Sequence, residues 1–223
     1  EFVNKNIAWE KKKSTNIGID LAMFNNRFEF TAEWYKNRSE DLLYGVPVPT
    51  QTGVANATVT MNAASMDNSG FEFSATYRNH DHPFKYDVSA NLSTLKNKVT
   101  SLGFGTTSYI TGAYATYVGQ EIGQFYGWVY EGIARTQSDL DNHATQQGAN
   151  LGDCLYKDIS GPNGEPDGVI DAYDQTVLGS GLPKVNFGLS AHMEYKNFDL
   201  SISTYGVLNY HVSDDIYNSL NSC

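Results

Sequence analysis

Six segments of this 223-residue chain alternate between apolar and polar side chains at every second position. In one of them Phe28, Phe30 and Ala32 form the apolar set, and the residues between them are Glu29 and Thr31. Successive side chains of a β-strand point to opposite faces, so each segment is predicted to be a strand with one apolar and one polar face. The predicted strands span residues 15–23, 27–37, 70–79, 84–92, 185–195 and 198–208.

The predicted connections alternate in length. Short turns lie at 25–26, 79–83 and 196–197, and the asparagines of the first tolerate the positive φ angles of a tight hairpin. The connections over 38–69 and 99–184 are long. Short turns at one end of a sheet and long loops at the other are typical of bacterial outer-membrane β-barrels, whose loops lie outside the cell.

A soluble β-sandwich also alternates, but three features weigh against one. The predicted strands are about ten residues long, which suits a tilted membrane crossing, whereas soluble strands average about five or six. Aromatic residues such as Trp34 and Tyr195 gather near the ends of the apolar faces, as in the girdles of membrane barrels. The connection over 99–184 is long for a compact soluble domain. The residues favour the barrel and leave the sandwich open.

Composition and motifs exclude several function classes. No window of the chain is apolar over the length of a membrane-spanning helix. The net charge of -10 argues against nucleic acid as a partner. No GxSxG, HExxH, Walker or GxGxxG motif occurs, and Asp139 and Asp141 lie in a polar loop that would not separate their pKa values. His80 and His82 share a short turn without a third ligand, and His192 occupies a polar-face position. No catalytic residue and no enzymatic activity are predicted.

An acidic, glycine-containing segment near residue 165 has the spacing of a calcium-binding loop. Oxygen-bearing positions recur as 1, 3, 5, 7, 9 and 12 of the loop register, with Gly168 at the sharp turn. Asp158 with Ser160 is an alternative source of the first ligand. A solvated acidic turn is the other interpretation. The predicted ligands of a structural Ca²⁺ ion are Asn163, Glu165, Asp167, Val169, Asp171 and Asp174.

Aromatic residues crowd the long connection that precedes this segment. They would either stack on a ligand or anchor a partner, as aromatic side chains do at interfaces, or form a small packed core within the loop. For any single residue the packed core is favoured. The residues are Tyr109, Tyr114, Tyr117, Phe125, Tyr126, Trp128 and Tyr130.

Short motifs follow one another along nearly the whole chain. They are Trp-Glu-Lys at 9–11, Thr-Asn-Ile-Gly-Ile-Asp at 15–20, Asn-Asn-Arg at 25–27, Asn-Ser-Gly-Phe-Glu at 68–72, Gly-Gln-Glu-Ile-Gly-Gln-Phe-Tyr-Gly at 119–127, Asp-Gly-Val-Ile-Asp at 167–171, Leu-Pro-Lys at 182–184 and Phe-Asp-Leu-Ser at 198–201. In kind and order they resemble the barrel segments of the SusC/RagA branch of TonB-dependent outer-membrane transporters. Each motif is weak alone, and the ordered series is specific.

The resemblance implies an all-β fold: an antiparallel transmembrane β-barrel segment, about six strands of a larger barrel, with long extracellular loops. An open sheet in lipid leaves backbone groups unpaired at both edges, so the chain is expected to be part of a longer protein. Residues 1–98 are predicted to hold four barrel strands and one external loop. Residues 99–184 are predicted to form a long extracellular loop region with the calcium-loop-like motif. Residues 185–223 would supply two further strands, the last part being truncated.

The resemblance also implies a location and a function. The chain would belong to a TonB-dependent receptor of the bacterial outer membrane that imports glycan or peptide nutrients. Its partners would be a SusD-like surface lipoprotein, outer-membrane lipid, and the TonB complex acting on a plug region that this chain does not show. The alternatives are a passive structural barrel or adhesin, and a secreted carbohydrate-binding β-sandwich. The residues that contact the ligand are not predicted.

Overall fold

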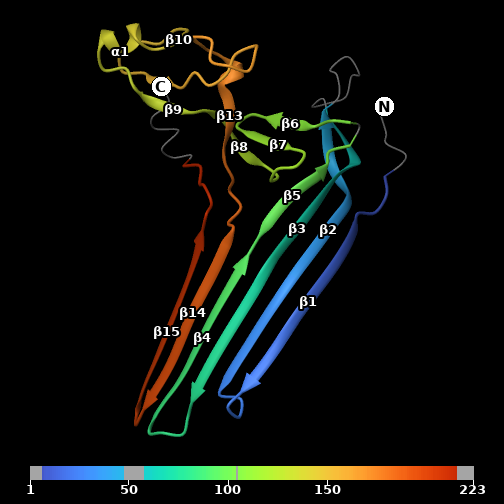
Figure 1. Ribbon diagram of the computed structural model, residues 1–223, viewed down its shortest axis with the longest axis vertical. Coiled ribbons are helices and arrows are strands. Elements are labelled where there is room, and N and C mark those ends of the chain that lie inside the picture. Colours follow the sequence, from blue (N-terminus) through green and yellow to red (C-terminus); the bar gives the residue numbers. More distant parts are fainter. Residues whose placement is uncertain (1–6, 48–57, 104, 215–223) are drawn as a thin grey trace. The chain divides into compact units, whose positions relative to one another are not determined.

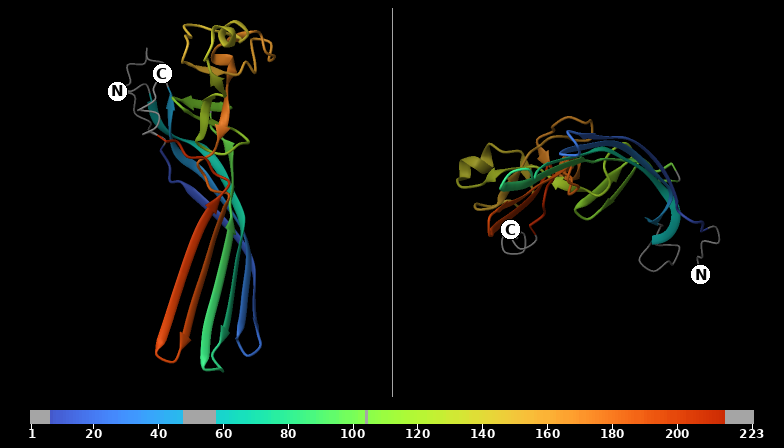
Figure 2. Two further views of the ribbon diagram at one scale, coloured as in Figure 1. Left: turned by 90° about the vertical axis from the view of Figure 1, so that its left-hand side faces the viewer. Right: turned by 90° about the horizontal axis from the view of Figure 1, so that it is seen from below.

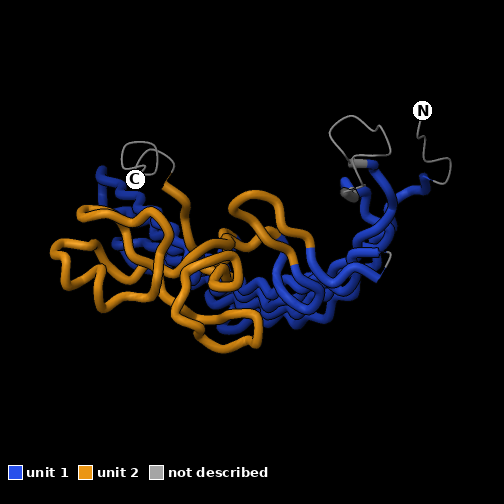
Figure 3. The backbone as a smooth tube through the Cα atoms, turned by 90° about the horizontal axis from the view of Figure 1, so that it is seen from above, with its two compact units in different colours: residues 1–108, 117–122, 182–210 blue, residues 109–116, 123–181, 211–223 orange. Residues whose placement is uncertain are grey.

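The computed structural model describes residues 7–47, 58–103 and 105–214. The chain divides into two compact units (Figure 3). Unit 1 comprises Glu1–Ser108, Tyr117–Ile122 and Leu182–Tyr210, and unit 2 comprises Tyr109–Thr116, Gly123–Gly181 and His211–Cys223.

Unit 1 is built on one antiparallel sheet whose long strands follow each other in chain order, β1-β2-β3-β4-β14-β15 (Figure 1). Seen from below, these strands follow an arc (Figure 2). The sequential antiparallel sheet predicted from the six alternating segments is therefore confirmed. The strands are β1 Lys11–Met23, β2 Phe28–Pro47, β3 Thr58–Asn79, β4 Phe84–Thr94, β14 Val185–Tyr195 and β15 Phe198–Leu208, and the shorter β5, Lys96–Ser101, pairs with β3.

The register places the predicted apolar positions on one face of the sheet. Residues directly opposite each other in an antiparallel pair share a face, so each row of partners can be followed across the strands. One apolar row runs through Leu21, Phe30, Ala75, Ala90 and Leu189. The neighbouring row on the other face runs through Asp20, Thr31, Ser74, Asn91 and Gly188. The face assignment made from the sequence is confirmed.

The hairpin of β2 and β3 extends well beyond the predicted strands. β2 has 20 residues and β3 has 22, so most of the segment 38–69, predicted as a loop, is strand. The ladder continues past a register shift between Ser39 and Leu42, where Asp41 adopts a φ of 58°, as far as the pair Pro47 and Thr58. Alternation of apolar and polar residues fades there while backbone pairing persists, which is why the sequence pattern missed it.

The three predicted short turns lie at one end of the sheet, and the second begins after Asn79, which still pairs with Tyr86. Lys196 and Asn197 alone connect β14 to β15, as expected. The turn between β1 and β2 has four residues, 24–27, because Phe24 also adopts a positive φ and the Arg27 N–H bonds the Phe24 carbonyl at 3.3 Å. The predicted two-residue hairpin at 25–26 is therefore wrong in length.

A close backbone approach explains the glycine of the Asn-Ser-Gly-Phe-Glu motif. The Phe71 N–H donates to Thr94 Oγ1 at 2.9 Å, and the Tyr35 hydroxyl donates to the Thr94 carbonyl at 3.1 Å. A Cβ at Gly70 would overlap the Thr94 carbonyl oxygen and would lie 2.8 Å from the Tyr35 hydroxyl oxygen. Only glycine fits where β4 gives way to β5 beside β3.

The apolar face of the strands is uncovered within unit 1. Ile19 and Leu200 are each 53% exposed, and Leu189 is 49% exposed. The most buried apolar side chains of unit 1 are instead Val99 and Leu102, in and just after β5. A contiguous apolar face of this kind requires a nonaqueous neighbour. Within the described part of unit 1 no second sheet packs on it, so the β-sandwich interpretation is wrong.

Unit 2 consists of short elements. A four-stranded sheet has the order β13-β8-β7-β6, β11 pairs with β9, and β10 pairs with β12 in parallel. Across the described residues, no helix has the length and apolarity needed to cross a membrane. The elements are β6 Ser108–Thr111, β7 Tyr114–Tyr117, β8 Gln124–Trp128, β9 Tyr130–Ile133, α1 Gln137–Asp141, β10 Thr145–Gln146, β11 Cys154–Tyr156, β12 Val169–Ile170, η3 Ala172–Asp174 and β13 Gln175–Gly179.

Candidate functional site

The polar face of the sheet carries alternating charges near the short turns. Arg78 Nη1 lies 2.7 Å from Glu29 Oε1, and Arg78 is the cross-strand neighbour of Asp87. Asp87 Oδ1 lies 2.9 Å from His80 Nε2. Hydroxyl and amide side chains occupy the next rows away from the turns, including the Thr76 and Ser89 hydroxyls, 3.0 Å apart. The polar face therefore offers hydrogen-bonding groups and paired acidic and basic side chains to a molecule in contact with it.

His192 lies on this polar face, as its sequence position predicted. Its Nδ1 is 2.8 Å from Ser201 Oγ, and its Nε2 is 3.1 Å from Glu194 Oε1. An ionised carboxylate only accepts, so a neutral imidazole here carries its proton on Nε2 and accepts the Ser201 hydroxyl at Nδ1. All three residues lie on the strand pair β14 and β15, where His192 and Ser201 are direct partners. The contact was not predicted because it depends on that register.

The acidic segment of unit 2 is organised around the carboxylate of Asp174. This side chain is fully buried, and its Oδ1 accepts the N–H groups of Ile159 and Ser160 at 2.8 and 3.1 Å. Its Oδ2 accepts the Asp171 N–H at 2.8 Å. Burial alone would raise the pKa of Asp174, but these backbone donors outweigh it and hold the pKa below its usual range. Asp174 therefore ties residues 159–160 to η3 as a charged acceptor.

The other carboxylates of the segment also accept backbone N–H groups. Asp158 accepts from Asp167 at 3.3 Å and from Gly168 at 2.6 Å. Asp171 Oδ1 accepts from Tyr173 at 2.7 Å, which caps η3. Asp158 therefore lies beside the acidic segment, where its side chain contacts these backbone donors and also the side chain of Asp174.

Three of the predicted calcium ligands have different surroundings in the structure. Asn163 and Glu165 lie on an exposed turn, and Asp174 is turned to its three N–H donors. In the part of the chain that the structure describes, no group of three or more His, Cys, Asp or Glu side chains is placed to hold a metal ion. The geometry supports a capping role for these carboxylates. Calcium binding stays a prediction from the sequence.

The aromatic residues of the same unit pack in pairs. Tyr114 and Phe125 have ring centroids 5.6 Å apart, and Trp128 and Tyr156 have centroids 5.9 Å apart. Trp128 Nε1–H also donates to the Asp171 carbonyl at 2.7 Å. Tyr114 and Trp128 are nevertheless 50% and 39% exposed, so these pairs are contacts at the surface of unit 2 and the packed core stays a prediction.

The acid pair noted in the sequence has a structural role. Asp139 Oδ2 accepts the N–H groups of Thr136 and Arg135 at 2.8 and 2.9 Å, and these donors lower the pKa of Asp139. Asp141 Oδ1 accepts from Gln137 Nε2 at 2.9 Å. Asp139 completes a capping box with Thr136 at the start of α1.

His143 is a polar contact that the sequence analysis missed. Its side chain is only 9% exposed, its Nδ1 lies 2.8 Å from the Ala144 carbonyl oxygen, and its Nε2 lies 3.1 Å from Glu131 Oε2. Both ring nitrogens thus face oxygen atoms. Glu131 belongs to β9 and His143 follows α1, so no local motif could have joined them.

An antiparallel sheet of long, sequential strands with one uncovered apolar face and one polar face is the wall of a transmembrane β-barrel. Comparison with known proteins agrees. The chain belongs to the family described as TonB dependent receptor-like, beta-barrel, whose model matches residues 2–209. Members of this family are outer-membrane proteins, so the chain is assigned to the bacterial outer membrane.

Within this family, comparison with individual relatives shows that the chain is similar to the SusC/RagA branch, as the motifs indicated. The chain is 32% identical over 213 residues to TonB-dependent receptor P3 of Formosa agariphila, covering 91% of this chain and 21% of that protein. It is 29% identical over 228 residues to TonB-dependent receptor SusC of Bacteroides thetaiotaomicron, covering 97% and 21%. It thus spans about a fifth of these relatives' length.

A solved structure shows the same fold. The chain superposes on one from the structure of the RagAB peptide transporter with a TM-score of 0.75. The two are 22% identical, and the match covers 93% of this chain and 22% of that one. The likeness places the strands of this chain in the wall of a larger barrel.

Proposed function

We propose that this chain forms part of the wall of an active importer for glycan or peptide nutrients. The observation that carries the proposal is the polar face of the sheet in a chain of the TonB-dependent receptor family. The name of one similar structure, the RagAB peptide transporter, supports the peptide class, and SusC is named as a TonB-dependent receptor without a substrate. Resemblance supplies the glycan class.

The polar face suits the passage of a hydrophilic ligand. Its rows combine hydroxyl and amide groups, such as Ser74, Asn91 and Ser190, with paired charges, such as Arg78 with Glu29. Such groups exchange hydrogen bonds with water and with sugar hydroxyls or peptide amides at little net cost. The opposite face, which is apolar, would contact outer-membrane lipid.

The proposed partners follow from the same resemblance. A SusD-like surface lipoprotein would cover the outer opening and hold the ligand. The TonB complex would supply energy through a plug region elsewhere in the full-length protein. An active importer differs in this respect from a passive structural barrel or adhesin, which needs neither partner.

Uptake by cells that express the full-length protein tests the proposal. Cells would be given a labelled oligosaccharide pool or a labelled oligopeptide pool, with the gene present, deleted, or present in a strain without a functional TonB complex. Uptake of one pool that requires both the gene and TonB supports active import. Gene-dependent uptake that persists without TonB identifies a passive barrel instead. If deletion of the gene leaves the uptake of both pools unchanged, a role in uptake of these nutrients is contradicted.

Affinity purification of the full-length protein from mildly solubilised outer membranes tests the partner. Recovery of a stoichiometric surface lipoprotein supports the proposed lid. If the protein is purified intact and folded, in the presence of the imported pool, but no lipoprotein is recovered with it, the proposed lid is contradicted.

A further inference from the structure

On β1, β2, β3 and β5 the apolar face of the sheet ends at a row of residues, and the next row on the same face is basic. The apolar row farthest from the short turns contains Ile17, Trp34 and Phe71. The next row on the same face contains Thr15, Lys36, Ser69 and Lys96, and the row beyond contains Lys13, Arg38, Asp67 and Lys98. We call the six cations of these rows and of Lys11 the basic belt: Lys11, Lys13, Lys36, Arg38, Lys96 and Lys98.

The basic belt is opposite in sign to the chain as a whole. The chain has a net charge of -10 and only 15 lysines and arginines, yet six of them lie in this patch. Three carboxylates accompany them, on Glu40, Asp41 and Asp67. The patch therefore keeps a positive balance, which is unexpected for a random distribution in so acidic a chain.

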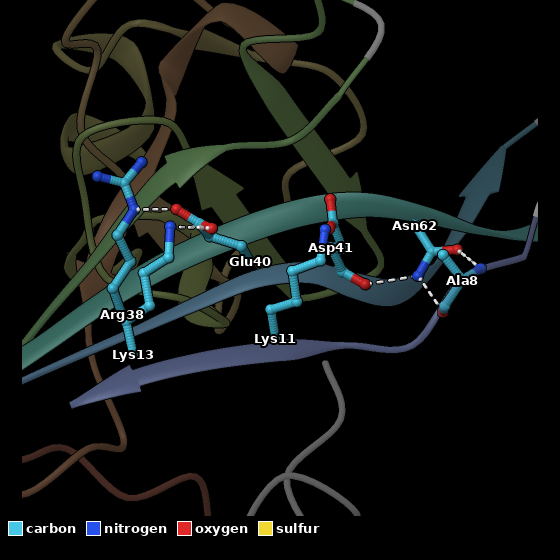
Figure 4. Close-up of polar contacts among 7 residues, drawn as sticks. All are labelled: Ala8, Lys11, Lys13, Arg38, Glu40, Asp41 and Asn62. Atoms are coloured by element: carbon cyan, nitrogen blue, oxygen red, sulfur yellow. Dashed lines mark hydrogen bonds and ion pairs between the residues drawn. The ribbon is translucent and has the colours of Figure 1, made fainter.

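Four of the cations form ion pairs that leave them accessible, and Figure 4 draws three of these cations, Lys11, Lys13 and Arg38. Lys13 Nζ and Arg38 Nε lie 2.7 and 3.0 Å from the two oxygens of Glu40, and Lys11 Nζ lies 2.8 Å from Asp41 Oδ2. Lys36 Nζ lies 3.3 Å from Asp67 Oδ2. The side chains of these four cations are between 47% and 67% exposed. Such exposed ion pairs contribute little to folding stability and can rearrange around an added anion.

The remaining two cations, Lys96 and Lys98, are not part of these ion pairs. Lys96 and Lys98 are exposed, and among the described residues neither forms an ion pair. Their strand, β5, is bonded to β3, so their place beside Asp67 and Ser69 is set by backbone register. Two unpaired ammonium groups next to a paired arginine leave room for an anion with several oxygens.

The position of the basic belt along the strands indicates which kind of anion would lie beside it. The belt lies on the far side of the apolar rows from the short turns, which is the side of the long connections. In outer-membrane barrels that side faces the cell exterior. One row is about 6.7 Å along a strand, so the lysines begin within a side chain's length of Trp34 and Phe71. In that orientation the belt would be level with the headgroups of the outer leaflet, and the aromatic row would be level with the acyl chains.

We infer that the basic belt binds the phosphate groups of a phosphorylated lipid in the outer leaflet, while the apolar rows beneath it contact the acyl chains. Arg38 offers a planar fork for two phosphate oxygens, and the lysines act as point charges around it. This interaction is independent of what the receptor imports, so failure of the proposed nutrient uptake would leave it unaffected.

The test uses the full-length protein in mild detergent, with bisphosphorylated lipid A as the probe. Binding would be measured by native mass spectrometry, with dephosphorylated lipid A and inorganic phosphate as comparison ligands. The test variant is Lys36→Gln with Lys96→Gln and Lys98→Gln. A control variant with the same charge change replaces Lys12, Lys85 and Lys157 by glutamine, because the first two are on the polar face of the sheet and the third is in unit 2.

The expected loss is about fivefold in affinity for each lysine at a lipid surface, hence ~100-fold for the triple variant. The control variant should bind as the parent does, and replacing the three lysines by arginine should retain binding. Heat-modifiable migration on gels would confirm that each variant contains a folded barrel. Equal binding of dephosphorylated lipid A, an equal loss in the control, or competition by inorganic phosphate at the lipid's own concentration would overturn the inference.

Discussion

Leu189 and Ser190 are adjacent in β14 and point to opposite faces of the sheet, so one pair of substitutions tests the face assignment. Leu189 partners Ala90 and Thr204, and Ser190 partners Ser89 and Ser203. Both side chains are exposed in unit 1, so Leu189→Arg and Ser190→Arg would be equally tolerated by a soluble sheet. They differ only if one face meets lipid and the other meets a polar lumen.

The position of Leu189 sets the magnitude. It is four residues from Val185 and six from Tyr195, the two ends of the strand, so it lies about 13 and 20 Å from them along β14. With a strand tilt of about 40°, these distances become heights of about 10 and 15 Å, close to the membrane midplane. Arginine facing lipid there costs about 2–4 kcal/mol. The folded-to-unfolded ratio should therefore fall roughly 30- to 900-fold for Leu189→Arg.

Ser190→Arg should change stability by less than about 1 kcal/mol, because its guanidinium enters a hydrated face that already carries His192 and Glu194. The assay is folding of the full-length protein into phosphatidylcholine vesicles across a urea series, with the folded fraction read from heat-modifiable gel migration. Equal shifts of the two midpoints, or a larger shift for Ser190→Arg, would refute the assignment of the faces.

Three further predictions concern single sites. Gly70→Ala should lower barrel stability by about 1–3 kcal/mol, because its Cβ would overlap the Thr94 carbonyl, and an unchanged unfolding midpoint would contradict this. The pKa of Asp174 is depressed in the folded state, so its contribution is complete above the unfolded pKa of about 3.9 and is lost as pH falls through the folded pKa. The protection of the Ile159 and Ser160 amides from exchange, relative to an unstructured peptide at the same pH, should therefore fall below about pH 4. Asp174→Asn should abolish that pH dependence; the same acid response in the variant would assign it to another group. If the acidic segment binds calcium, titration calorimetry of the full-length protein should show heat that Asp167→Ala and Asp171→Ala reduce, and the absence of heat in the parent would leave the carboxylates as caps only.

Alternation by itself was enough to predict the six long strands and the face of each residue within the alternating segments. The bounds of β14 and β15 match the predicted 185–195 and 198–208, because both ends of these strands coincide with the ends of the apolar pattern. A period of two leaves no freedom in which face a side chain takes once the strand is placed. The short turns also predicted the pairs β1–β2, β3–β4 and β14–β15, since strands joined by a short turn pair with each other.

Features set by pairing rather than by composition required the tertiary structure. The extension of β2 and β3 through much of 38–69 depends on backbone hydrogen bonds, which do not need an alternating sequence. The reason for glycine at position 70 lies in Thr94, on another strand. Likewise, the spacing of Asp174 suggested a metal ligand, whereas its hydrogen bonds to Ile159 and Ser160 use the carboxylate for backbone donors far from it in sequence.

The basic belt shows the same division. Its lysines and its arginine are spread over residues 11–98 in the sequence, and the short lysine run at 11–13 includes only two of the six. The register of β1, β2, β3 and β5 brings Lys13, Arg38 and Lys98 into one row on one face. The sequence alone determined the type of wall, because strand periodicity is local. Only the tertiary structure decided which distant residues act together on that wall, because cross-strand register is a property of pairing between segments.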